Sequence, residues 1–358
     1  MIIKNADKPV LILDVNRCKR NIERIAAKAE LHNCEFRPHF KTHQSKIIGR
    51  WFRESGVTGI TVSSPEMAHY FAEDGWDDIT IAFPFYMAQL KKLKELEKLC
   101  KLCLFVTSEK DLAILDKELN NPFTFMIEVD SGYGRSGLPY TDKEYINSLI
   151  ESSKSLDSNM FKGFYIHDGR TYSARNKNEI ISAIQPSLYA LEDLKKHFPE
   201  AKISIGDTPS ATVLDNLDFA DEITPGNLVF FDWMQVQIGS CSVNDVSLFA
   251  QLPIAQNKPN NKNVIIHGGA VHLSKDFIEK DGDKNFGQVV NYFHNGKIEP
   301  IEKSWLTALS QEHGTLNNLP TDAKDYITVI PIHSCLTANL FDHYITTDGQ
   351  RIEKRVLS

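Results

Sequence analysis

The chain lacks the features that mark several protein classes. Its 358 residues include only six cysteines, at positions 18, 34, 100, 103, 241 and 335. This scatter is no disulfide framework, so we expect a reducing, cytoplasmic location. There is no hydrophobic run of membrane-spanning length and no charged start followed by an apolar segment, so we expect neither a membrane partner nor a signal peptide. The net charge of −7 gives no reason to expect nucleic acid as a partner.

Two motifs are also missing. No GxGxxG follows a predicted strand, which disfavours an open dinucleotide-binding sheet. Cys100 and Cys103 form a CxxC, but no second CxxC accompanies it, and it overlaps the predicted strand Lys101–Thr107. We interpret this pair as structural, with a redox or metal-binding pair as the alternative.

The residues that are present alternate between strand-like and helix-like patterns. Hydrophobic residues make up 42% and charged residues 24%, as in globular proteins. After a first strand, Pro9–Leu13, and a first helix, Arg17–His32, eight strands are predicted: Glu35–Thr42, Gly59–Ser64, Asp78–Pro84, Lys101–Thr107, Thr124–Asp130, Phe161–His167, Lys202–Ile205 and Leu228–Asp232. The helices between them are Pro65–Glu73, Met87–Leu99, Glu109–Asn120, Asp142–Ser153, Asn178–Lys196 and Ala211–Leu217. Eight strands alternating with helices predict an α/β fold, a (β/α)8 TIM-type barrel.

The pattern changes after Trp233. Short alternating runs separated by turns predict a C-terminal, mostly-β domain. We expect the barrel over residues 14–235. We expect the β domain to consist of residues 236–358 together with residues 1–13.

A single lysine stands at the end of the first barrel strand, in the stretch Arg37–Gln44. Active sites of such barrels lie at the C-terminal ends of the strands. If Lys41 is desolvated there, burial disfavours its charged form and frees the amine to attack carbonyls. The alternative is a solvated lysine at a strand end.

The segments around the last two strands suit an anion. Gly206–Ser210 leads into a helix, and Thr224–Asn227 offers small and polar residues. Backbone N–H groups there favour a phosphate, although a helix start alone explains the first segment. Together with Lys41, an anion site implies a phosphorylated aldehyde, and pyridoxal 5′-phosphate (PLP) is the obvious candidate.

His333 and Cys335 follow an apolar run. On a strand, residues two apart face the same side. Imidazole and thiolate suit zinc, and two protein ligands leave room for substrate. The alternative is a pair of buried core side chains.

These segments resemble a known family. The stretch Arg37–His43 is similar to the lysine motif of fold-type III PLP enzymes, which have an alanine-racemase-like N-terminal barrel and include D-serine dehydratase and D-threonine aldolase. The resemblance implies that Lys41 is catalytic and holds PLP, that Arg135 faces the pyridine nitrogen, and that His333 and Cys335 bind the metal. It also implies further cofactor-binding residues: Tyr165, Tyr172, Thr208, Gly226 and Asn227.

The resemblance implies a PLP- and divalent-metal-dependent lyase acting on D-3-hydroxy amino acids. Several aldolase relatives have a carboxylate as the second metal ligand, so Cys335 favours a dehydratase that converts D-serine to pyruvate and ammonia. Asn339-Leu340 is more aldolase-like, so a D-threonine aldolase, releasing glycine and an aldehyde, is the alternative. An amino-acid racemase and a non-catalytic PLP-binding protein are further alternatives. The metal is expected to be Zn²⁺, with Mn²⁺ or Mg²⁺ possible, and the protein a homodimer.

Overall fold

The computed structural model describes residues 7–156, 159–257, 264–293, 295–319, 323 and 325–356. It divides into two compact units. The barrel unit consists of Arg24–Lys41 and Phe52–Gly226, and the C-terminal unit consists of Met1–Glu23, Thr42–Trp51 and Asn227–Ser358. The domain boundaries expected from the sequence stay a prediction.

The barrel unit is built on a parallel sheet, and its described part has eight strands. In spatial order they are β2 (Glu35–Phe36), β10 (Glu222–Ile223), β9 (Lys202–Ile205), β8 (Asn159–Ile166), β6 (Phe123–Asp130), β5 (Lys101–Phe105), β4 (Asp78–Pro84) and β3 (Ile60–Val62). An isolated parallel bridge between His39 and Thr61 brings the two ends of this sheet together. A short strand, β7 (Leu138–Pro139), pairs with β6. The fold predicted from the alternating pattern is confirmed.

Two predicted strands differ from the structure. The prediction of an eighth strand at Leu228–Asp232 is wrong, because a 3-10 turn, η3 (Asn227–Val229), occupies its start. The true eighth strand, β10, has two residues, too few to show a period. The first strand ends at Phe36 instead of Thr42, because Pro38 has no N–H for a ladder and the chain turns over residues 40–43.

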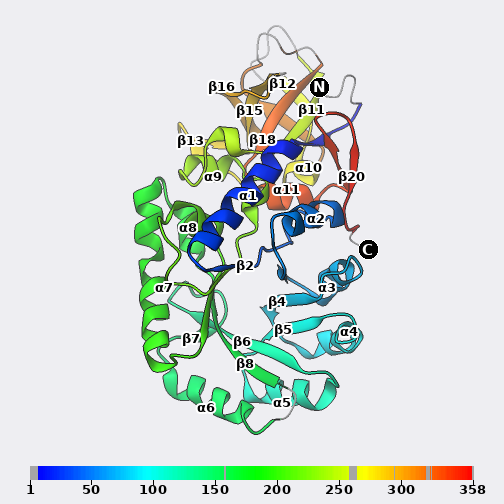
Figure 1. Cartoon of the computed structure of the whole chain (residues 1–358). Helices are drawn as coiled ribbons and strands as arrows, with labels where there is room; N and C mark the ends of the chain where they lie inside the picture. The colour runs from blue at the N-terminus through cyan, green and yellow to red at the C-terminus, as the bar shows by residue number, and fades with distance from the viewer. Residues whose placement is uncertain are drawn as a thin grey trace. The chain divides into compact units, whose positions relative to one another are not determined.

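Helices cover the outside of the barrel strands (Figure 1). They are α3 (Pro65–Ala72), α4 (Leu90–Leu96), α5 (Glu109–Glu118), α6 (Lys143–Ser153), α7 (Lys177–His197) and α8 (Thr208–Val213). Several begin at a side chain that accepts a backbone N–H, such as Ser64 from Met67 and Ser108 from Asp111. Helices α1 (Val15–Leu31) and α2 (Lys46–Glu54) contribute residues to both units.

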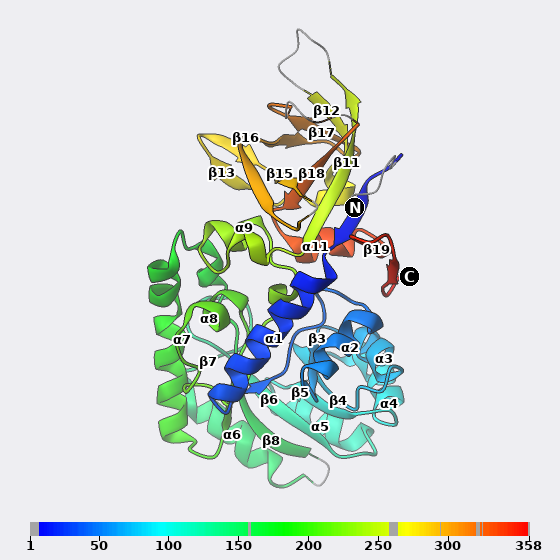
Figure 2. The ribbon, with the colours of Figure 1, turned by 45° about the horizontal axis from the view of Figure 1, so that its top comes forward.

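The C-terminal unit contains a second, mostly antiparallel sheet (Figure 2). In spatial order its strands are β12 (Val264–His267), β17 (His313–Leu316), β16 (Ile298–Leu309), β15 (Gly287–Tyr292), β18 (Tyr326–Pro331), β11 (Leu248–Gln256), β1 (Val10–Leu13), β19 (His343–Thr346) and β20 (Arg351–Glu353). This unit also contains a small hairpin, β13 (Ile278–Lys280) and β14 (Asp283–Asn285), and the helices α9 (Trp233–Gln237), α10 (Ala270–Leu273) and α11 (Ser334–Asn339). The pairing of β1 with β11 and β19 brings the start of the described chain into this sheet.

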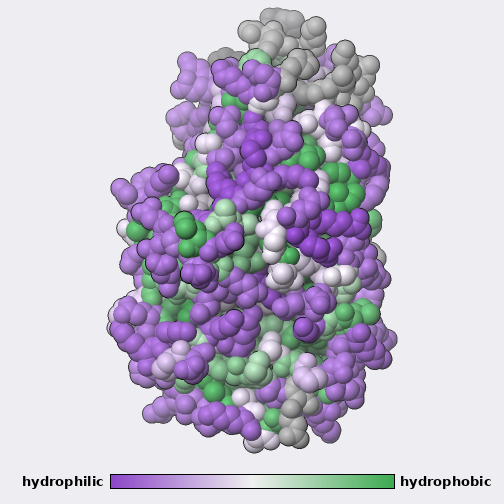
Figure 3. Space-filling view, viewed as in Figure 1, coloured by the Kyte–Doolittle hydropathy of each residue, from purple (hydrophilic) through white to green (hydrophobic). Residues whose placement is uncertain are grey.

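Each unit has an apolar interior, as the burial of Phe125 in one and Leu252 in the other illustrates. The face of the molecule seen in Figure 3 is mostly hydrophilic, with hydrophobic atoms in separate small areas. Within the described ranges, no helix combines the length and hydropathy needed to cross a bilayer.

Candidate functional site

Lys41 lies in the barrel unit, just beyond the end of β2. Its side chain is exposed, and its backbone N–H donates to His39 Nδ1 over 3.3 Å. The sequence suggested that the Lys41 amine is shielded from water. In this structure the protein does not bury it, because Lys41 lies in the turn that follows β2. The position at the C-terminal end of a barrel strand agrees with the prediction.

His167 lies close to Lys41 and Arg135, and sequence reasoning gave it no role. Burial, followed by the positive charges of Arg135 and Lys41, lowers the pKa of His167 to about 4. The ring is therefore neutral at pH 7. Its Nδ1 bonds to the Gly206 carbonyl, which only accepts, so Nδ1 carries the proton and Nε2 is left as an acceptor. The sequence does contain a signal for His167, because it stands at the end of the apolar predicted strand Phe161–His167, where barrel active sites lie.

Arg135 stands in the loop after β6, as predicted. Its side chain is half exposed, and Nη2 lies 3.6 Å from Glu128 Oε1. Burial raises the pKa of Glu128, although Ser136 Oγ donates to the same carboxylate oxygen over 2.8 Å. The guanidinium is charged at any working pH, so it supplies a permanent positive charge at this end of the barrel.

Tyr172 and Thr208 come together beyond the ends of β8 and β9, and Tyr165 of β8 lies against Gly206. A Cβ on Gly206 would lie 2.1 Å from the Tyr165 hydroxyl, so glycine leaves room for that ring. The Thr208 N–H donates to the Tyr172 hydroxyl over 3.4 Å. The Thr208 hydroxyl is buried and has no hydrogen-bond partner among the described residues. An unpartnered buried hydroxyl fits an acceptor such as a phosphate oxygen.

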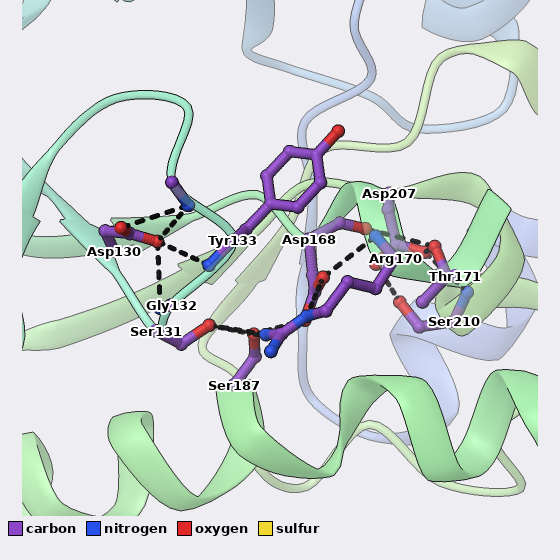
Figure 4. Close-up of polar contacts among 11 residues, drawn as sticks. Asp130, Ser131, Gly132, Tyr133, Asp168, Arg170, Thr171, Ser187, Asp207 and Ser210 are labelled. Carbon is purple, nitrogen blue, oxygen red and sulfur yellow. Dashed lines mark hydrogen bonds and ion pairs between the residues drawn. The ribbon is translucent and has the colours of Figure 1, made fainter. Parts of the chain in front are cut away.

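A polar network fixes the loops that carry these residues (Figure 4). Arg170 donates through Nε and Nη2 to Asp168, at 2.8 and 2.6 Å, and through Nη2 to Ser131 Oγ at 2.8 Å. Thr171 Oγ1 donates to Asp207 Oδ1 at 3.1 Å. Since these residues follow β6, β8 and β9, the network ties three strand ends together and limits their movement.

The C-terminal unit carries the predicted metal pair. His333 precedes α11 and Cys335 lies in its first turn, so the expected strand spacing is wrong, because β18 ends at Pro331. The two side chains nevertheless hydrogen-bond. Burial disfavours the charged ring, but hydrogen bonds to Asp276 and Cys335 outweigh burial and raise the pKa of His333 to about 11.

Asp276 was missed by sequence reasoning. Its Oδ2 lies 2.9 Å from His333 Nδ1, which leaves Nε2 for another partner. Metal-binding histidines usually donate their other ring nitrogen to a carboxylate in this way. The Thr42 hydroxyl also lies 3.2 Å from Cys335 Sγ. Imidazole, thiolate and a supporting carboxylate therefore fit a divalent metal.

Asn227 belongs to the C-terminal unit, whereas Gly226 ends the barrel unit. The Asn227 Nδ2 donates to Asp232 Oδ2 at 2.6 Å and to Cys335 Sγ at 3.6 Å. Its Oδ1 is buried without a hydrogen-bond partner among the described residues. The phosphate contacts expected for Gly226 and Asn227 stay a prediction.

Comparison with known proteins places this arrangement in a family. The alanine racemase N-terminal domain matches residues 13–232, and a putative serine dehydratase domain matches residues 253–347. The chain belongs to the D-serine dehydratase and D-threonine aldolase family of fold-type III PLP enzymes. The resemblance seen in the lysine motif is thereby confirmed, and PLP is the cofactor of the family.

Members of this family resemble the chain along almost its whole length. It is 27% identical to the D-threo-3-hydroxyaspartate dehydratase of Delftia sp. (strain HT23), covering 96% of this chain and 95% of the relative. It is also 27% identical to the D-serine dehydratase of Dictyostelium discoideum, covering 98% and 96%. The solved structure of the Delftia enzyme superposes with a TM-score of 0.87 at 25% identity, covering 98% of both chains. A D-threonine aldolase of Arthrobacter sp. is 23% identical, covering 97% and 91%.

Proposed function

We propose that this protein is a PLP- and divalent-metal-dependent lyase that eliminates water from D-3-hydroxy amino acids. The observation that carries the proposal is Cys335 beside His333, with Asp276 at Nδ1 of the imidazole. A thiolate in this position favours the dehydratase branch. Two relatives that match along almost the whole chain are named dehydratases.

The barrel unit supplies the groups that fit PLP. When bound, the cofactor withdraws electrons from the amino acid Cα. Lys41 would hold its aldehyde until the substrate amine takes its place there, and the released Lys41 amine would then take the Cα proton. Arg135 would face the ring nitrogen and keep it unprotonated, since a guanidinium does not give up its own proton. The buried Thr208 hydroxyl and the Tyr172 hydroxyl would bind the phosphate.

His167 adds a neutral acceptor to this group. Its Nδ1 proton is committed to Gly206, so Nε2 can accept a hydrogen bond from substrate or cofactor at neutral pH. Tyr165 fills the space beside Gly206, and its side chain would limit how far the pyridine ring of the cofactor can shift.

The metal would be held by His333 and Cys335, and Zn²⁺ suits this donor set. A divalent ion supplies Lewis acidity for a departing hydroxyl. Asp276 fixes the orientation of the imidazole. A solved cysteine-to-alanine mutant of a D-threo-3-hydroxyaspartate dehydratase is described as being in the metal-free form, which supports a metal in this family.

A D-threonine aldolase is the second candidate. Relatives named 3-hydroxy-D-aspartate aldolase and D-threonine aldolase also match the chain. Asn339, which accepts a hydrogen bond from Gln44 Nε2 at 2.8 Å, belongs to the aldolase-like part of the C-terminal motif. A racemase would not need the metal pair.

The substrate panel that separates these activities is D-serine, D-threonine and D-threo-3-hydroxyaspartate, with both PLP and Zn²⁺ added. A dehydratase releases ammonia and a 2-oxo acid, an aldolase releases glycine and an aldehyde, and a racemase yields the L-enantiomer. We expect ammonia and a 2-oxo acid from at least one D-substrate. Glycine and aldehyde without ammonia would contradict the proposal.

We further propose that the protein is a homodimer and that it is cytoplasmic. Light scattering of the purified protein tests whether it is a dimer.

A further inference from the structure

We propose that His267, His272 and Glu312 form a second divalent-metal site in the C-terminal unit, distinct from the pair His333 and Cys335. Ligand atoms of the three side chains lie within 4.8 Å of one another. Nε2 of His267 is 3.8 Å and Nε2 of His272 is 3.9 Å from Glu312 Oε2. Two imidazoles and one carboxylate are a donor set that binds zinc and leaves a position for water. The proposal does not depend on the lyase reaction.

Backbone hydrogen bonds place two of the ligands next to each other. His267 is the last residue of β12, and its register partner His313 directly follows Glu312. The Gly268 N–H donates to the Glu312 carbonyl over 2.9 Å. The third ligand, His272, is in α10. The ligand positions therefore come from a paired sheet edge and a short helix.

Gly269 brings α10 against the segment before β17. A Cβ at this position would lie 2.2 Å from the Gln311 carbonyl oxygen, so only glycine allows the approach. The Ala270 N–H then donates to the Ser310 carbonyl over 2.8 Å. This contact sets His272 beside His267, with ring centroids 5.5 Å apart and planes at 86°. Both imidazoles can thus face one ion without stacking on each other.

The protonation of His272 has to change when an ion binds. The Gly269 N–H donates to His272 Nδ1 over 3.3 Å, so the neutral ring carries its proton on Nε2. When an ion binds Nε2, the ring proton moves to Nδ1, which can then no longer accept from the Gly269 N–H. The hydrogen bond that is lost is a long one, and the bond between Nε2 and the ion compensates for it.

The site would also act on the segment that follows it. Leu273, the last residue of α10, accepts a hydrogen bond from Thr337 Oγ1 in α11 over 3.3 Å. Three residues later, Asp276 binds His333. An ion bound to His272 would therefore fix the start of the segment 272–276. The end of this segment, Asp276, orients His333 of the first proposed metal pair.

The test is zinc binding to the full-length protein in which the first pair is removed, as His333→Ala/Cys335→Ala. Elemental analysis after dialysis against Zn²⁺ should find one ion per chain. Adding Glu312→Ala, an exposed position, should weaken binding by at least about tenfold, measured by competition with a chromophoric chelator. Zinc should also raise the melting temperature of the double variant and not of the triple variant.

The matched control is His69→Ala in the same background. His69 on α3 is exposed and has Nδ1 3.6 Å from Glu73, so it is a histidine–carboxylate pair on another surface. We expect this change to leave zinc binding unaltered. If the double variant does not fold, the wild type should bind two ions and Glu312→Ala one. Zinc binding that is absent from the double variant, or equally tight after Glu312→Ala, would overturn the proposal.

Discussion

At the scale of single residues, the orientation of His333 depends on one carboxylate. Asp276 lies 2.9 Å from Nδ1, and hydrogen bonding to His333 lowers the pKa of Asp276. Such supporting carboxylates fix both the tautomer and the angle of a metal-binding ring. The proposed metal site therefore includes Asp276 as well as the two expected ligands.

Asp276→Asn should weaken metal affinity by about 10- to 100-fold while leaving both proposed ligands in place. The amide keeps the shape of the carboxylate but loses its charge. Isothermal titration of the apo protein with Zn²⁺ measures the change, in a Glu312→Ala background that removes the second proposed site. Asp283→Asn, an exposed carboxylate of the same unit, is the control. Equal affinities for the two variants would refute the role given to Asp276.

A second residue-scale prediction concerns Asp207, which is buried and caps α8. Burial raises the pKa of Asp207 to about 6, although Ser210 and Thr171 donate hydrogen bonds to it. The folded chain thus holds this proton more tightly than the unfolded chain. Its contribution to stability is full below pH ~4 and is lost as the pH rises to about 6.

Asp207→Asn removes this titration and keeps an oxygen that can accept from the Ser210 N–H. The free energy of unfolding of the wild type, relative to the variant, should therefore fall by about 2 kcal/mol between pH 4 and pH 7. Urea titrations at the two pH values measure it. If wild type and variant differ in their free energy of unfolding by the same amount at pH 4 and at pH 7, the pKa of Asp207 is not raised.

At the scale of elements, β8 contains a bulge. Phe125 pairs with Phe161 and Met126 with Gly163, so Lys162 is an extra residue. The Lys162 ammonium lies 2.6 Å from Glu222 Oε2 of β10. Gly163 has φ +155°, and a Cβ there would lie 1.9 Å from the Lys202 carbonyl oxygen of β9. The bulge thus requires glycine at a close approach of two strands.

Gly163→Ala should destabilise the protein by about 3 kcal/mol or more, because it adds a backbone clash to an unfavourable φ. The control is Gly56→Ala, at φ +87° with no atom within 4 Å of the added Cβ. That change should cost only about 1 kcal/mol, from the backbone conformation alone. Chemical denaturation of both variants compares the two. Similar losses would mean that the clash is relieved by a small shift of β9.

At the scale of the whole molecule, the sequence predicted the fold because strands and helices alternate with clear periods. It failed at β10, whose two residues show no period, and at the end of β2, where Pro38 interrupts the ladder. The lysine motif and the His–Cys pair could be proposed from the sequence because each is local. Asp276 could not, since 57 residues separate it from His333 and only the fold brings them together.

Removal of metal should lower the activity of the whole enzyme. Dialysis against EDTA should reduce 2-oxo acid formation from the preferred D-substrate by at least about tenfold, because the departing hydroxyl loses its Lewis acid. Zn²⁺ should restore the rate, while the PLP absorbance stays unchanged throughout. Full activity in protein that elemental analysis shows to be free of metal would favour a racemase.

The proposed lyase depends most directly on the amine of Lys41, which would carry the cofactor. Borohydride reduction of the PLP-loaded protein makes the bond between lysine and cofactor permanent, and peptide mass spectrometry then locates it. We expect the pyridoxyl group on the peptide that contains Lys41, and no labelling at that peptide in Lys41→Ala. A pyridoxyl group on a different lysine of the wild-type protein, or none after reduction of protein that shows the PLP absorbance band, would contradict the account.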